Sequence, residues 1–452
     1  MKVLCIDLGS TYTKLTAIDL VKSQIIGSAK AYTTIDTHVL DGFYNALNSL
    51  PIGLSDTSSY DEIRAASSAA GGLKMIAVGL VPSLTATAAK LATNSAGAKL
   101  LKTYSYELSP QEAKEIKEAK PDILLLSGGI DGGNKDVILR NAHIISKIDD
   151  TFPVIVAGNK SVAEECASLL NSSQKPSQVV ENVMPSLGVL NIEPAKSAIR
   201  ELFIRRIISA KGLDDAQAIM KQEIIPTPLA VFNACELLST LSELVAIDVG
   251  GATTDVYSMA HGSPTKPLSI QKGLVEPFAK RSVEGDLGVR YSIPSLVGEA
   301  GLEYIAQLAK LPTAQVSEWL EACTEDTSLV GQLDSPQAAI DEALASACTK
   351  LAMERHAGTL ESVYTFSGEV FIQNGKDLSE IGMLIGSGGS IINSPNAEEI
   401  LKHALQSPSD THALKPTSPR IFIDRQNILT PAGLLSKTHP KEALSLMQRY
   451  IS

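Results

Sequence analysis

Short apolar runs separated by glycine turns occur near the start of the chain and again past its middle. Residues 2–6, 13–19 and 24–33 are rich in Val, Ile, Thr and Leu, and tight turns separate them, so they predict three consecutive strands. A strand, a glycine turn and a second strand return at residues 243–259. The pattern therefore predicts two hairpins of similar design, one in each half of the chain.

Between and after these hairpins, the spacing of apolar residues changes. From residue 109 to 170, buried-type apolar runs alternate with amphipathic stretches of helical period, which predicts parallel strands joined by helical crossovers. Residues 293–357 follow a helical period and predict an inserted helical subdomain. We therefore expect an α/β fold with a domain boundary near residue 240, giving domains 1–240 and 241–452.

Length and composition narrow the class of protein. A chain of 452 residues is too long for one core, so more than one domain is expected. The net charge of -11 argues against nucleic-acid and anionic-membrane partners, which require clustered Lys and Arg. No apolar run approaches the roughly 18 residues of a membrane helix, and no signal-peptide pattern is present, so a cytoplasmic location is expected. The scattered cysteines are expected to be reduced and buried: Cys5, Cys166, Cys235, Cys323 and Cys348.

The two predicted hairpins carry the same polar residues at the same offsets. Residues 7–14 read DLGSTYTK and residues 248–255 read DVGGATTD, so Asp, Gly and Thr coincide. A glycine-rich turn exposes backbone N–H groups to an anion, and an aspartate just before it can hold a hydrated Mg²⁺. One copy alone could be a plain hairpin, but two copies at the start of each half indicate a phosphate site. Neither copy is a G-x-x-x-x-G-K-[ST] loop or a G-x-G-x-x-G fingerprint.

These motifs resemble those of the actin, sugar-kinase and Hsp70-type ATPase superfamily, which are D-x-G-[ST]-x-x-[ST]-K and D-x-G-G-x-T-x-D. The glycine loop at residues 386–390, GSGGS, is similar to the superfamily's third signature, which holds adenosine. The resemblance implies two actin-like, ribonuclease-H-like domains around a nucleotide cleft. It also implies ATP or ADP and Mg²⁺ as cofactors.

The resemblance then implies roles for single residues. Asp7 and Asp248 would hold Mg²⁺. Asp255 would either orient the attacking water or cap its turn, and Lys14 would either neutralise phosphate charge or be solvated. The residues expected to contact the nucleotide are Gly9, Ser10, Thr11, Thr13, Lys14, Gly250, Gly251, Ala252, Thr253, Thr254, Gly386, Ser387, Gly388 and Gly389. Glu284 and Asp286, in the loop after the second hairpin, are further candidates.

A closer resemblance is carried by the segments LLLSGGIDGGNKDVILRNA, IPTPLAVFNACELLS and AIDVGGATTDVYS. They are similar to the glutamate-mutase-associated MutL family, whose members resemble large subunits of reactivating factors for adenosylcobalamin-dependent enzymes. This implies an ATP-driven chaperone that releases damaged cofactor from a partner mutase. Whether the chain is an enzyme stays open, with Mg²⁺-dependent ATP hydrolysis as the expected activity.

Other possibilities remain at this stage. A small-molecule kinase of the sugar-kinase type or an actin-like filament ATPase would carry the same nucleotide motifs, and a homodimer is left open. Glycines at 128–129 and 132–133 follow a buried strand. They could form either a second ligand loop or a plain turn that caps the next helix. His143 and His356 lie on helical patterns and are expected to be structural or solvated.

Overall fold

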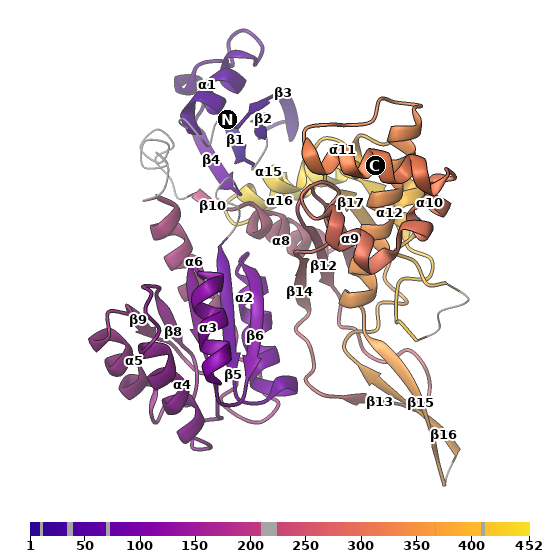
Figure 1. Ribbon diagram of the computed structural model, residues 1–452. Coiled ribbons are helices and arrows are strands. Elements are labelled where there is room, and N and C mark those ends of the chain that lie inside the picture. The colour runs from indigo at the N-terminus through magenta and orange to yellow at the C-terminus, as the bar shows by residue number, and fades with distance from the viewer. Residues whose placement is uncertain (10–11, 34–38, 69–72, 209–223, 367, 408–411) are drawn as a thin grey trace. The chain divides into compact units, whose positions relative to one another are not determined.

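The computed structural model describes all residues except 10–11, 34–38, 69–72, 209–223, 367 and 408–411 (Figure 1). Contacts divide the chain into two compact units. Unit 1 comprises Met1–Ala234 and Leu429–Leu446, and unit 2 comprises Cys235–Ile428 and Met447–Ser452. The division thus falls a few residues before the boundary expected near 240, and a late segment of the expected 241–452 domain lies with unit 1.

Unit 1 contains a five-stranded sheet in the order β10-β4-β1-β2-β3. β2 runs antiparallel to β1 and β3, whereas β4 is parallel to both β1 and β10. The central strand β1 is buried from Val3 to Ile6, as expected of a strand covered on both faces. The strands are β1 (Lys2–Leu8), β2 (Tyr12–Asp19), β3 (Gln24–Tyr32), β4 (Glu62–Ser67) and β10 (Ile224–Pro226).

Unit 2 repeats this topology in the order β14-β12-β11-β17-β18. Its first three strands form an antiparallel meander, and its last two run parallel to the first. The strands are β11 (Leu244–Val249), β12 (Thr254–Met259), β14 (Ala279–Glu284), β17 (Met383–Ser387) and β18 (Arg420–Ile423). In both units the order is third, second, first, fourth, fifth, which is the ribonuclease-H-like order. The predicted α/β fold with two actin-like sheets is confirmed.

A second sheet of unit 1 is inserted between β4 and β10. Its five strands are all parallel, in the order β6-β5-β7-β8-β9, which is the order of flavodoxin-like domains. The alternating pattern correctly predicted parallel strands, although they belong to a sheet separate from the hairpin sheet. The strands are β5 (Lys74–Gly79), β6 (Lys99–Ser105), β7 (Ile123–Leu126), β8 (Val154–Val156) and β9 (Ser177–Val179). Helices of this insert are α2 (Thr87–Ser95), α3 (Pro110–Ala119), α4 (Asp136–Ser146), α5 (Ala163–Ser172) and α6 (Glu193–Ile208).

The stretch predicted to be helical lies between β14 and β15. It contains α9 (Ile293–Ala300), α10 (Leu302–Ala309), α11 (Thr313–Glu325) and α12 (Pro336–His356). Small residues along α12, such as Ala343, Ala345 and Ala347, are buried in one core with strands β11 and β12. The small side chains allow the long helix to lie close to the sheet, so these helices share the core of unit 2.

Unit 2 also carries a small sheet in the order β13-β16-β15. It is formed by β13 (Ser269–Lys272), β15 (Thr359–Thr365) and β16 (Gly368–Asn374), and β15 and β16 are a hairpin that projects from the rest of the unit (Figure 1). The other α-helices in the described residues are α1 (Val39–Asn48), α8 (Thr227–Leu238), α13 (Gly389–Ile392), α14 (Ala397–Lys402), α15 (Leu429–Leu435) and α16 (Pro440–Tyr450). Among the helices that the structure describes, none combines the length and the apolar character needed to cross a membrane.

Candidate functional site

The two repeated motifs form hairpin turns with the same backbone hydrogen bond. The N–H of Gly9 donates to the carbonyl oxygen of Tyr12 at 3.1 Å, and the N–H of Gly250 donates to that of Thr253 at 2.9 Å. A Cβ atom on Gly9 would lie 2.5 Å from the Tyr12 oxygen, so a side chain there would displace the turn. The sequence repeat therefore encodes the same closing hydrogen bond in both units. Ser10 and Thr11 lie outside the described residues.

Asp7 lies near the end of β1, directly opposite Lys14 on β2. Thr227, the first residue of α8, donates its hydroxyl to Asp7 Oδ1 at 2.7 Å. Burial raises the pKa of Asp7 above its ordinary value, and the charge of Lys14 and the Thr227 hydrogen bond lower it only in part. Sequence reasoning did not single out Thr227, although it lies in the segment IPTPLAVFNACELLS that carries the family resemblance.

This raised pKa gives a pH-dependent prediction. The folded chain holds the Asp7 proton more tightly than the unfolded chain, so ionising Asp7 lowers the free energy of unfolding as pH rises from 3.8 through the folded-state pKa. Asp7→Asn cannot ionise. The free energy of unfolding of this variant minus that of the natural protein should therefore rise across that pH range and level off above it. Urea unfolding followed by circular dichroism, without nucleotide or metal, measures the difference, and a difference that stays flat or falls with pH contradicts the assignment.

Asp248 lies next to the third predicted motif within unit 2. It pairs with Ser387 in the parallel register of β11 and β17. Gly388 follows with a φ of +88°, and a Cβ atom there would lie 2.6 Å from Asp248 Oδ1 and 2.3 Å from the Val249 oxygen. Only glycine fits between the carboxylate and the backbone at this point. The structure thus brings the glycine loop of residues 386–389 against the second hairpin.

The segment after β14 supports the second hairpin turn. The N–H of Val289 donates to the Gly250 oxygen at 3.2 Å, and the N–H of Arg290 donates to the Gly251 oxygen at 2.8 Å. The Ser292 hydroxyl donates to the Ala252 oxygen at 2.7 Å. The carbonyl oxygens of the turn are the acceptors in these bonds. The bonds therefore fix the shape of the turn, and the N–H groups of Gly251 and Ala252 take no part in them.

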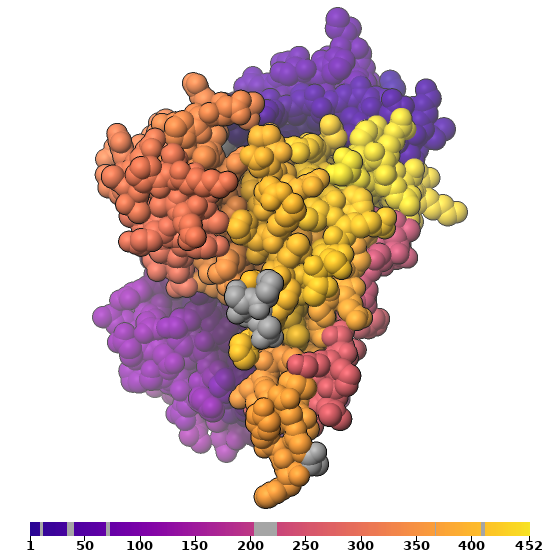
Figure 2. Space-filling model, turned by 90° about the vertical axis from the view of Figure 1, so that its right-hand side faces the viewer, coloured from indigo at the N-terminus to yellow at the C-terminus, as the bar shows by residue number. Residues whose placement is uncertain are grey.

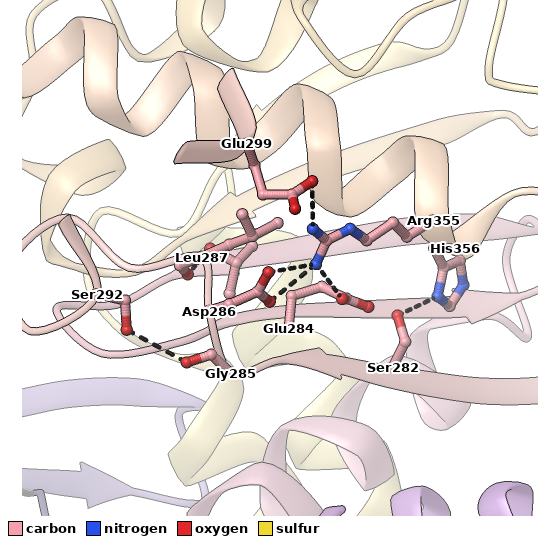
Figure 3. A network of polar contacts seen from close by, with 10 residues as sticks. Ser282, Glu284, Gly285, Asp286, Leu287, Ser292, Glu299, Arg355 and His356 are labelled. Atoms are coloured by element: carbon pink, nitrogen blue, oxygen red, sulfur yellow. Dashed lines mark hydrogen bonds and ion pairs between the residues drawn. The ribbon is translucent and has the colours of Figure 1, made fainter. Parts of the chain in front are cut away.

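Glu284 and Asp286, which the sequence offered as nucleotide contacts, form ion pairs with an arginine. Arg355, near the end of α12, lies 2.9 Å from Glu284 Oε2, 2.8 Å from Asp286 Oδ1 and 3.2 Å from Glu299 Oε2 (Figure 3). Its hydrogen bond to Asp286 is the main reason that the pKa of Arg355 is raised. These carboxylates therefore fasten the loop to α12.

His356 is structural, one of the two roles that the sequence allowed. The ring is fully buried, and its Nδ1 lies 2.7 Å from the Ser282 hydroxyl (Figure 3). Its Nε2 lies 2.8 Å from the Ser258 hydroxyl. Together with Arg355, it anchors the end of α12 to β12 and β14. The supporting loop and the sheet are thus joined through one helix terminus.

Two of the expected phosphate contacts point into the core. The Thr13 side chain is fully buried, with its hydroxyl 3.1 Å from that of Thr33. The Thr254 hydroxyl is also buried and donates to the Leu287 oxygen at 2.8 Å. Strand alternation explains this, because each threonine follows the turn on the side that faces the core. Their hydroxyls therefore stabilise the hairpins, and their contact with a phosphate stays a prediction.

Asp255 forms an ion pair with a buried arginine. Arg281 on β14 lies with Nε 2.8 Å and Nη2 2.6 Å from Asp255 Oδ1, and its side chain is 3% exposed. Burial alone would lower the pKa of Arg281, but the charge of Asp255 raises it above the ordinary value. The hydroxyl of Thr253 lies 3.5 Å from the other carboxylate oxygen, Oδ2. The ion pair with Arg281 therefore stabilises the hairpin, and a role of Asp255 in orienting the attacking water stays a prediction.

Asp424 is a further buried carboxylate that sequence reasoning missed. It follows β18, and its Oδ1 accepts from the N–H of Ile428 at 2.6 Å while its own N–H donates to the Gly386 oxygen at 2.9 Å. β18 has the same position in unit 2 as β10 in unit 1, so Asp424 corresponds to Thr227. The sequence feature that indicates this carboxylate is a single aspartate directly after the apolar run IFI.

The glycine loop after β7 is stabilised by neighbouring asparagines of the insert. Asn159 Nδ2 lies 3.2 Å from the oxygens of both Gly133 and Asn134, and Asn182 Nδ2 donates to the Gly129 oxygen and to Asp131 Oδ1, each at 3.0 Å. Both amides are buried. These bonds explain the loop as a structural turn before α4, which is one of the two possibilities that the sequence left open.

Comparison with known proteins decides the family. The model of the family described as MutL protein matches residues 3–451. Protein MutL of Clostridium tetanomorphum is 42% identical over 456 residues, which span 99% of this chain and 98% of that protein. The chain belongs to the MutL family. The resemblance predicted from the sequence is confirmed.

Solved structures similar to this MutL-family chain are distant. Gluconate kinase from Lactobacillus acidophilus is 10% identical, with 100% of this chain and 92% of that chain covered at a TM-score of 0.34. Component A of (R)-2-hydroxyglutaryl-CoA dehydratase from Acidaminococcus fermentans is 8% identical, with 99% and 96% covered at a TM-score of 0.28. These TM-scores are low, so the fold assignment depends on the strand order of the two sheets.

Proposed function

We propose that this MutL-family protein is a Mg²⁺-dependent ATPase that binds ATP and ADP through its two hairpins. One observation carries the proposal. In each unit, an aspartate is the last residue but one in the first strand of a five-stranded sheet, and a glycine turn closed by the same hydrogen bond follows that strand. Packing alone does not require an aspartate near the end of the first strand in both units, so the repeated turn supports a binding role.

The chemistry of the turns suits phosphate. The N–H groups of Gly251 and Ala252 lie at a turn whose carbonyl oxygens already accept hydrogen bonds from residues 289–292. Backbone N–H groups in such turns bind anions, and the absence of a side chain at Gly251 lets a phosphate oxygen approach. Lys14, on the strand after the first turn, adds positive charge close to Asp7.

The carboxylates suit a hydrated Mg²⁺. Mg²⁺ keeps several waters and takes only one or two protein carboxylates, usually beside substrate phosphates. In the part of the chain that the structure describes, no group of three or more His, Cys, Asp or Glu is placed to hold a metal. Asp7 and Asp248 would therefore each offer a single carboxylate, with water and phosphate as the remaining ligands. Bound Mg²⁺ would neutralise the charge that develops on the transferred phosphoryl group.

We further propose that ATP turnover serves to reactivate an adenosylcobalamin-dependent mutase of the glutamate mutase type, by releasing damaged cofactor in the cytoplasm. Membership of the MutL family supports this, because the family resembles large subunits of reactivating factors. The acceptor of the γ-phosphate would then be water. A kinase of the sugar-kinase type would instead transfer it to a hydroxyl group.

Labelled ATP distinguishes the two outcomes. The purified protein is incubated with Mg²⁺ and γ-labelled ATP, with and without a mixture of polyols and sugar acids. Label appearing only as inorganic phosphate, at a rate that the polyols do not change, is the expected result. Label in an organic product would contradict the ATPase proposal, and turnover that persists after Mg²⁺ is chelated would contradict the role of the metal.

A further inference from the structure

A short stretch of chain, residues 288–292, packs against the second hairpin turn, and we call it the supporting strip. The Gly251 oxygen accepts from the backbone N–H of Arg290 at 2.8 Å and from that of the next residue at 2.9 Å. A Cβ atom on Gly288 would lie 2.5 Å from the carbonyl carbon of Ala252, so no side chain fits between the strip and the turn at that point. The position of the turn therefore depends on the position of the supporting strip.

The buried side chain of Arg290 fastens the supporting strip to the helical part of unit 2. Its Nη2 lies 2.7 Å from Oδ2 of Asp341 on α12. Its Nε donates to the Leu329 oxygen at 2.8 Å, and its Nη1 donates to the Val289 oxygen at 2.6 Å. One guanidinium group thus joins the strip both to α12 and to the loop between α11 and α12.

Asp341 joins the same network to α11. Its Oδ1 accepts from the indole Nε1 of Trp319 at 3.1 Å, and its Oδ2 also accepts from the N–H of Gly331 at 3.0 Å. Figure 2 shows the helices of this stretch, coloured coral to orange, at the surface of unit 2. A continuous path of hydrogen bonds therefore runs from the second hairpin turn through Arg290 and Asp341 to α11.

The energetics of this network indicate that Arg290 provides a defined position. A buried ion pair requires both charges to be desolvated, and it is often no more stabilising than apolar side chains of similar volume. The planar guanidinium group instead holds its donors at fixed angles. Here these donors meet three different acceptors, one within the strip and two in the helical part of unit 2. The arginine therefore fixes where the strip lies.

We propose that Arg290 is a positioning residue of the nucleotide site and that, with Asp341, it couples phosphate binding at the second turn to α11 and α12. This inference rests on the proposed binding of ATP at that turn. A phosphate held by the N–H groups of Gly251 and Ala252 shifts the turn, and the supporting strip moves with it. The guanidinium group passes the shift to Asp341, because such coupling travels through contiguous hydrogen bonds. Trp319, bound to the other oxygen of that carboxylate, then changes its environment when the nucleotide binds.

Asp341→Asn breaks this path at one atom. Asparagine keeps an oxygen acceptor for Trp319, but it replaces the acceptor of Arg290 by an NH₂ group, which can only donate. The Kd for adenylyl imidodiphosphate, a non-hydrolysable ATP analogue, with Mg²⁺ should rise about tenfold, the effect of weakening one hydrogen bond to a charged phosphate. Isothermal titration calorimetry measures this Kd. Saturating analogue should change the fluorescence of Trp319 in the natural protein but not in the variant.

Glu276→Gln is the matched control. Glu276 forms an ion pair with Lys280 at 2.8 Å in the same unit, and its side chain is 15% exposed, against 16% for Asp341. It precedes β14, and only the far end of β14 pairs with Thr254 beside the turn. We therefore expect this variant to keep the natural Kd and the natural fluorescence response. Arg290→Lys is a second test variant, because it keeps the charge but loses the planar fork, and it should raise the Kd as well.

A pair with a purely structural role would give a different pattern. Loss of folded protein lowers the number of sites that calorimetry counts, but it leaves the Kd of the remaining sites unchanged. A natural Kd or a natural fluorescence response in Asp341→Asn overturns the inference, as does an equal effect of Glu276→Gln. Binding by the natural protein without any change in Trp319 fluorescence overturns it too. Failure of the proposed function is distinct, because the natural protein itself would then neither bind nor hydrolyse Mg-ATP, and the inference would fall with it.

Discussion

Asp248→Asn should lower Mg²⁺-dependent ATP turnover by about 100-fold or more while leaving the fold intact. Asparagine keeps the size and shape of aspartate beside Gly388, so the loop contact is preserved. The substitution removes the negative charge proposed to hold Mg²⁺. A bound metal stabilises the transition state by several kcal/mol, and each ~1.4 kcal/mol changes the rate tenfold. Phosphate release under saturating Mg-ATP measures the effect.

Asp149→Asn is the control for this variant. It makes the same chemical change at an aspartate whose side chain is 96% exposed in the insert of unit 1. Its ATP turnover should match that of the natural protein. Circular dichroism and thermal unfolding of both variants show whether the fold is retained. If a folded Asp248→Asn variant hydrolyses Mg-ATP at the natural rate, the assignment of the second hairpin is wrong.

Arg281→Met should lower the free energy of unfolding of unit 2 by about 3 to 5 kcal/mol. The substitution leaves Asp255 as a largely buried carboxylate, 13% exposed, without its arginine. Removing one partner of a buried ion pair is costly because the remaining charge stays desolvated. Urea unfolding followed by the fluorescence of Trp319 reports on unit 2, since this is the only tryptophan of the chain.

Two further variants show whether the lost stability comes from the ion pair between Arg281 and Asp255. Arg281→Met combined with Asp255→Leu replaces the whole pair by apolar side chains and should recover most of the lost stability. Arg420→Met, at an exposed arginine on strand β18 of the same sheet, should change stability by no more than about 0.5 kcal/mol. Recovery is the decisive outcome. A double variant as unstable as Arg281→Met would mean that the arginine acts through packing and not through Asp255.

The hairpins could be predicted because their information is local. An apolar strand, an aspartate and a glycine at a fixed offset determine the turn, and Gly9 and Gly250 make the same hydrogen bond in the structure. The partners of these motifs could not be predicted in the same way. Thr227 reaches Asp7 across 220 residues, and Arg281 meets Asp255 only because of the register of β12 and β14. A single sequence carries no signal for such pairings.

The division of the chain into two units also depends on long-range contacts that a single sequence does not reveal. The alternating pattern of residues 109–170 identifies parallel strands, but it does not say whether they extend the first sheet or form their own. The return of Leu429–Leu446 to unit 1 depends on long-range packing. In that segment a Cβ atom on Gly433 would lie 1.7 Å from the Ala230 oxygen, so α15 and α8 approach very closely. Contiguous boundaries drawn from sequence patterns miss a segment of this kind.

Recovery of an inactivated mutase is the most direct test of the proposed function. A glutamate mutase is loaded with hydroxocobalamin and incubated with the protein, Mg-ATP and fresh adenosylcobalamin, and mutase activity is then measured. We expect activity to return only when both the natural protein and ATP are present, and not with Asp248→Asn. ATP turnover by the natural protein without any recovery of mutase activity would contradict the reactivation proposal.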